Sequence, residues 1–81
     1  PRYPQVLINV AVASNDRKKE LMADDRLAQA IAQEESALNG DGRVLVRPSG
    51  TEALMRVMVE AKTEETAHTA AERLAKLIEA L

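Results

Sequence analysis

The sequence has 81 residues, of which 46% are hydrophobic, so it suffices for one small folded domain and excludes a second domain within these residues. It has no cysteine and no apolar run near the roughly 18 residues that span a bilayer, which excludes disulfides and argues against a membrane partner. Eleven basic and 13 acidic residues give a net charge of -2, and Tyr3 is the sole aromatic residue, which argues against nucleic acid. We expect a cytoplasmic protein and, since the chain opens at Pro1 and not Met, part of a longer polypeptide.

The first predicted element is a strand over residues 5–13. Valine and isoleucine alternate there from Val6 to Val12, which places them on one face of an extended segment. Residues 14–23 mix opposite charges and have no apolar repeat before Leu21. We therefore expect a solvated connection in this second segment.

Residues 24–38 predict an amphipathic helix, because leucine and isoleucine recur every three or four positions among alanines. Either Asp24 or Asp25 is expected to cap its first turn. Residues 39–42 read Asn-Gly-Asp-Gly, which is typical of a turn whose residues tolerate positive φ. The helix should therefore end near residue 38.

The second half of the chain predicts two strands, 43–47 and 53–61, joined as an antiparallel hairpin by the loop 48–52. Alternation in the second strand assigns three side chains to the core: Met55, Val57 and Val59. Residues 63–81 predict a helix that lays a stripe of small alanines on the sheet. The order β-α-β-β-α predicts a two-layer α+β domain, with a small, largely antiparallel sheet and two helices packed on one face.

Positive charge gathers around the predicted hairpin loop. Residues 43–56 contain three arginines against one glutamate, a local charge of +2. Arg47 can hold a phosphate through two parallel N–H bonds. The loop adds hydroxyl groups and backbone amides that an anion can approach: Ser49, Gly50 and Thr51. The same residue types are typical of an ordinary hairpin turn, so these residues alone leave a phosphate cradle and a plain turn equally open.

The remaining chemistry-bearing residues are explained by structural roles. His68 is the single histidine, so no imidazole cluster exists to hold zinc. The carboxylate pairs at 24–25 and 34–35 fit a helix cap and a solvated helix face. Ser49 has no nearby base to activate it as a nucleophile. We therefore expect no catalytic residue and no metal or cofactor site in these residues.

Residues 47–52, Arg-Pro-Ser-Gly-Thr-Glu, followed by the strand at 54–61, resemble the phosphate-binding signature in the last domain of the α-D-phosphohexomutases. Residues 4–10 resemble the opening strand of that domain, and residues 39–46 resemble its approach to the loop. The likeness thus covers nearly the whole chain. Within the superfamily, the flanking similarity favours the members that act on glucosamine phosphates.

The resemblance implies a cytoplasmic four-domain isomerase that interconverts glucosamine 6-phosphate and glucosamine 1-phosphate through a bisphosphate, on the route to cell-wall precursors. A phosphoserine in the first domain, Mg²⁺ in the second and a sugar-recognition loop in the third would supply its chemistry. This chain resembles the fourth domain, which has a TATA-box-binding-protein-like fold and holds the phosphate that is not transferred. Its implied partners are a phosphosugar and the other domains of the same chain, and alone it would be inactive.

Carried over residue by residue, the resemblance implies four phosphate-binding positions: Arg47, Ser49, Gly50 and Thr51. Glu52 and Arg56 match the motif as supporting residues. The chain departs from the family at Ala53, where proline is usual. Because alanine frees φ and adds a backbone N–H, this departure predicts a slightly more mobile loop.

Two other interpretations stay open. The flanking similarity is softer than the loop signature, so a superfamily member that acts on mannose or glucose phosphates is one of them. The other is a non-enzymatic module whose alanine-rich helix or sheet face docks a partner protein. The hairpin loop distinguishes the module from a phosphohexomutase domain, because only the latter should respond there to a phosphosugar.

Overall fold

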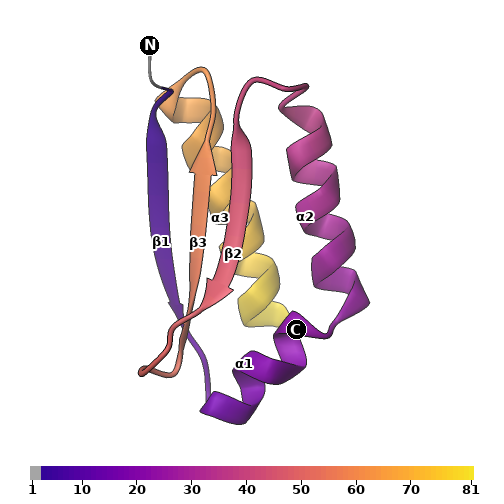
Figure 1. Ribbon diagram of the computed structural model, residues 1–81, viewed down its shortest axis with the longest axis vertical. Helices are drawn as coiled ribbons and strands as arrows, with labels where there is room; N and C mark the ends of the chain where they lie inside the picture. Colours follow the sequence, from indigo (N-terminus) through magenta and orange to yellow (C-terminus); the bar gives the residue numbers. More distant parts are fainter. Residues whose placement is uncertain (1–2) are drawn as a thin grey trace.

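The computed structural model describes residues 3–81, which form an antiparallel sheet of three strands in the order β1-β3-β2. The elements of the described residues are, in chain order, β1 (Gln5–Ala11), α1 (Asn15–Met22), α2 (Asp25–Ala37), β2 (Arg43–Pro48), β3 (Leu54–Glu60) and α3 (Glu64–Ala80). In Figure 1 α3 lies behind the sheet and α2 runs beside it. The predicted two-layer α+β architecture is confirmed. None of the helices in the described part is both long and apolar enough to cross a bilayer.

The segment 14–23 contradicts the prediction of a solvated connection, because most of it forms α1. Ser14 caps this helix, and its Oγ accepts a hydrogen bond from the Arg17 amide at 3.1 Å. The buried face of α1 consists of Lys18 and Leu21. Because one of its two buried residues is a lysine, this helix has no apolar repeat that would reveal it in the sequence. With α1 included, the order of elements is β-α-α-β-β-α.

The core lies between the sheet and the helices. The apolar side chains at alternate positions of β3 are fully buried, as predicted: Met55, Val57 and Val59. They meet a buried stripe on α3 that includes the small residues Ala67, Ala70 and Ala71 and the larger Leu74. Because alanines project little from a helix, α3 can lie close to the sheet. The same burial occupies the alanine-rich face, which leaves it no surface for a partner protein.

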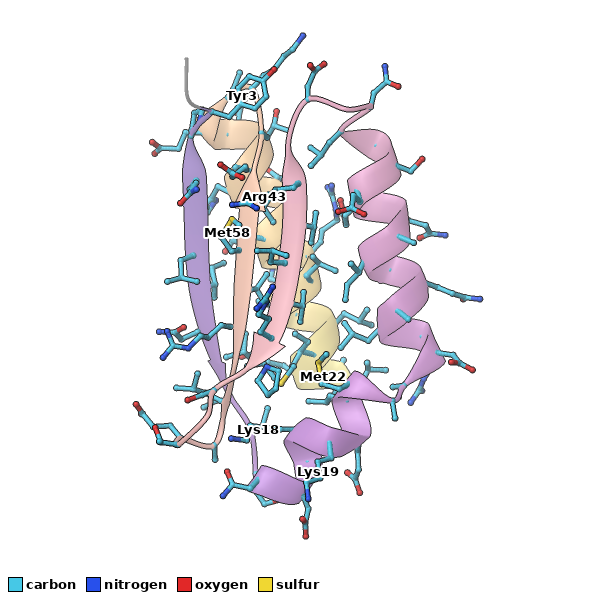
Figure 2. All side chains as sticks on the ribbon, viewed as in Figure 1. Tyr3, Lys18, Lys19, Met22, Arg43 and Met58 are labelled. Carbon is cyan, nitrogen blue, oxygen red and sulfur yellow. The ribbon has the colours of Figure 1, made fainter. Side chains whose placement is uncertain are left out.

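The strand register sorts the opposite face of the sheet, turned away from the helices, into rows. One row is polar, with Arg43 opposite Glu60, and the next is apolar, with Leu45 opposite Met58. Figure 2 looks onto this face, where Arg43 and Met58 are labelled. The third row, nearest the hairpin loop, places Arg47 directly opposite Arg56. Two arginines are thus side by side at one end of an open sheet face.

The turn between α2 and β2 has the backbone that its sequence predicts. Asn39 has φ 54° and Gly40 has φ 83°, both in the left-handed region. Gly42 has φ 146°, and a Cβ built on it would lie 2.9 Å from the carbonyl carbon of Glu60. Asp41 is held by the Tyr3 hydroxyl at 3.1 Å and by Lys62 Nζ at 3.3 Å. The turn is therefore packed against the end of β3.

Asp24 caps α2 and is also held by an arginine. Its Oδ1 accepts from the Arg26 amide at 2.8 Å, and Arg26 Nη2 donates to Oδ2 at 2.8 Å. These hydrogen bonds lower the pKa of Asp24 from 3.8 to about 2, and the bond from the Arg26 side chain has the largest effect. The cap thus favours the charged carboxylate.

The lowered pKa of Asp24 predicts an acid-dependent loss of stability. A carboxyl with a depressed pKa contributes stability that is complete above about 3.8 and disappears as the pH falls through about 2. Asp24→Asn retains an N-cap side chain but removes this titration. We expect the unfolding free energies of wild type and variant to converge between pH 4 and 2, measured by urea titration. Parallel curves over that range would contradict the assignment.

Candidate functional site

The loop between β2 and β3 projects beyond the sheet, at the end of the molecule where α1 lies (Figure 1). It comprises residues 49–53, and the predicted loop, 48–52, differs by one residue at each end. The Ser49 amide donates to the Leu54 carbonyl at 3.0 Å, and the Leu54 amide donates to Glu52 at 2.8 Å. These bonds close the base of the loop, so the residues at its tip have a defined geometry.

Ser49 braces the loop from inside. It is only 5% exposed, and its Oγ accepts from the Glu52 amide at 3.1 Å and from the Thr51 amide at a longer 3.4 Å. Sequence reasoning assigned this hydroxyl to a ligand. The structure instead places it in a turn within the loop, and its direct contact with phosphate stays a prediction.

The loop is also held from outside, by a residue that sequence reasoning missed. Lys18 Nζ donates to the carbonyl of Ser49 at 2.6 Å and to that of Glu52 at 2.7 Å. Figure 2 shows its side chain running from α1 toward the loop. The signal that could have found Lys18 is its spacing of three residues from Leu21, which places both on one helix face.

Arg47 and Arg56 differ from the other arginines in the described part of the chain. Each of the others forms an ion pair with a carboxylate: Arg17, Arg26, Arg43 and Arg73. Arg47 and Arg56 are exposed and, among residues 3–81, neither guanidinium has a hydrogen bond or ion pair. Like charges directly opposite on neighbouring strands destabilise a sheet. The pair is therefore a site of unneutralised positive charge that an anion would relieve.

Gly50 has no conformational reason to be glycine. Its φ is not positive, and a Cβ built on it would have no atom within 4 Å. Its amide makes no hydrogen bond within the described residues, and neither does the Thr51 hydroxyl. The fold would accept alanine at this position, so the absence of a side chain leaves room for something outside the domain.

A hollow of about 400 Å³ lies between the loop and α1. Its lining consists of Asn15, Lys18, Lys19, Met22, Pro48, Ser49 and Gly50. Arg47 and Arg56 do not line it, since they are on the open face of the sheet. Gly50 lines this hollow and follows Arg47 by three residues along the chain.

Comparison with known proteins identifies the family. Residues 7–77 match the family model described as phosphoglucomutase/phosphomannomutase, C-terminal domain. The chain belongs to this family. It is 51% identical over 77 residues to a phosphoglucosamine mutase of Geobacillus thermodenitrificans, which covers 95% of the chain and 16% of that protein. It is 53% identical over 81 residues to one of Thermus thermophilus, covering 100% of the chain and 17% of that protein.

A solved structure supports the same family assignment. The crystal structure of Aspergillus fumigatus N-acetylphosphoglucosamine mutase, in complex with GlcNAc-6P and magnesium, is similar over 94% of the chain and 15% of its own, with a TM-score of 0.76 and 29% identity. The chain thus spans about one sixth of the length of the relatives it matches. It is a phosphohexomutase domain.

Within this phosphohexomutase domain, the residues expected to bind phosphate are brought to one loop and the strand ends beside it. Arg47, Gly50 and Thr51 offer donors with no partner in residues 3–81. The Glu52 backbone helps to hold the loop in place, because its carbonyl accepts hydrogen bonds from Lys18 Nζ and from the Leu54 amide. In the described part, no group of three or more His, Cys, Asp or Glu side chains is placed to hold a metal ion.

Proposed function

We propose that this domain holds the non-transferred phosphate of a phosphosugar in a phosphoglucosamine mutase, which interconverts glucosamine 6-phosphate and glucosamine 1-phosphate. The observation that supports it most is the arginine pair of Arg47 and Arg56, unneutralised beside a loop with a free Gly50 amide. Guanidinium and amide donors together form the kind of site that binds a doubly charged oxyanion. The relatives named phosphoglucosamine mutase favour the amino sugar among the superfamily's substrates.

The proposed role is positioning. Phosphoryl transfer is catalysed chiefly by alignment and charge stabilisation, so a clamp remote from the reacting phosphorus still sets the rate. A site that recognises phosphate and ignores the sugar face can hold either end of a bisphosphate intermediate. The phosphoryl donor and the Mg²⁺ of the whole enzyme belong, in this proposal, to other domains of a cytoplasmic chain.

Gly50→Ala tests the proposal without disturbing the fold. We expect its unfolding free energy to stay within about 0.5 kcal/mol of wild type, because the new Cβ meets nothing. Binding of glucosamine 6-phosphate should weaken roughly tenfold, because the methyl group obstructs the approach of phosphate to the amide. Amide shifts of Gly50 and Thr51 during ligand titration measure the affinity.

Unphosphorylated glucosamine is the matched ligand control and should leave these amides unmoved. Equal responses to glucosamine and glucosamine 6-phosphate would contradict the proposal. So would unchanged affinity in Gly50→Ala, since the bare backbone at this position would then serve no ligand.

A further inference from the structure

Lys18 is a buried cation whose partners all belong to the candidate site. Lys18 is only 7% exposed, whereas the next residue, Lys19, is exposed. No carboxylate of the described residues pairs with it, and its hydrogen bonds go to the carbonyls of Ser49 and Glu52. Burial of an ammonium group is costly unless it is paired or hydrogen-bonded. Two short charge-assisted bonds to one loop are therefore a specific connection between α1 and that loop.

These two bonds determine the direction of two other groups in the loop. A trans peptide is planar, and its C=O and N–H point in opposite directions. No cis peptide occurs in the described chain. With the Ser49 carbonyl turned to Lys18, the Gly50 amide of the same peptide plane points away from α1. The Glu52 carbonyl also faces Lys18, so the Ala53 amide of that peptide plane likewise points away from the Lys18 ammonium group.

Both amides are unoccupied. Neither Gly50 nor Ala53 donates a backbone hydrogen bond within residues 3–81, although the Ala53 carbonyl accepts from Val12 at 2.9 Å. In an ordinary hairpin loop such groups would simply face water. Here one cation holds both carbonyls, so each of the two N–H groups points away from Lys18.

We infer that Lys18 is a positioning residue for the phosphate loop: it holds two carbonyls so that the Gly50 and Ala53 amides are presented to an anion before the anion binds. The inference rests on the proposed function and extends it to α1, which lies outside the phosphate-binding signature. Preorganised donors bind an anion more tightly than donors that must be ordered first. The uncompensated charge of Lys18 also favours a dianion nearby.

The test compares Lys18→Met with Lys76→Met, which removes the same charge from an exposed position of α3 that does not line the hollow. In the free chain, Lys18→Met should shift the Gly50 and Ala53 amide signals and lower their order parameters. Binding of glucosamine 6-phosphate should weaken roughly tenfold through a faster off-rate. Lys76→Met should match wild type in both respects. Wild-type signals and affinity in a folded Lys18→Met variant would overturn the inference.

A second readout needs no substitution, in case Lys18→Met does not fold. The ammonium protons of Lys18 should exchange slowly with water in the wild-type chain, and those of Lys19 rapidly. Equal, rapid exchange would overturn the inference. Because this readout uses the free chain, it is independent of the proposed function. Slow exchange without any binding of glucosamine 6-phosphate would refute the phosphate site, and the hydrogen bonds of Lys18 would then serve only to stabilise the loop.

Discussion

Gly42→Ala is expected to destabilise the domain by about 3 kcal/mol or more, which is a large part of the stability of a domain this small. Gly42 has φ 146°, a conformation that L side chains rarely adopt. The added Cβ would clash with the Glu60 carbonyl oxygen and lie 3.2 Å from Ala61 Cα. These are backbone atoms at the end of β3, so relief requires separating the strands where Arg43 faces Glu60. Urea unfolding measures the loss.

Gly40→Ala is the matched control, two residues earlier in the same turn. Its φ of 83° is also left-handed, but a Cβ there meets nothing within 4 Å. The variant should therefore lose only the conformational term, about 1 kcal/mol. Similar losses for both variants would show that φ alone, and not the contact between the turn and β3, makes Gly42 necessary.

Arg47→Ala is expected to weaken binding of glucosamine 6-phosphate by roughly 10- to 100-fold, since charge-assisted bonds contribute about 1.5–3 kcal/mol. Stability should stay constant or rise by a few tenths of a kcal/mol, because the substitution removes a like charge opposite Arg56. Calorimetric titration and urea unfolding of the same samples measure both effects. Weakened binding without destabilisation would identify a residue kept for its ligand.

Arg43→Ala removes the same charge from the other end of β2, where the guanidinium is already paired with Glu60. It should leave the affinity within about twofold of wild type, because the charge that it removes is distant and neutralised. Equal weakening by Arg47→Ala and Arg43→Ala would mean that the domain attracts anions through its general field. The arginine pair would then be no specific site.

Much of the fold could be predicted because its signals are local. The alternation in β3, the helical spacing in α3 and the Asn-Gly-Asp-Gly turn each lie within one short segment, and the structure places all three as expected. The hairpin loop was also within reach of sequence, since proline, serine and glycine follow a strand directly. The ligand of these residues could not be predicted from their chemistry alone, and only the resemblance and then the family match suggested one.

The chain by itself determined the two-layer α+β architecture, the hairpin and the candidate residues at its tip, because periodicity and turn chemistry act between neighbours. Only the tertiary structure decided that Ser49 faces inward and that Arg47 and Arg56 stand opposite each other without a counterion among residues 3–81. It also decided that α1 brings Lys18 to the loop. A lysine counts as polar in any sequence pattern. Its burial is tolerated only where the Ser49 carbonyl, 31 residues away along the chain, accepts a hydrogen bond from its ammonium group.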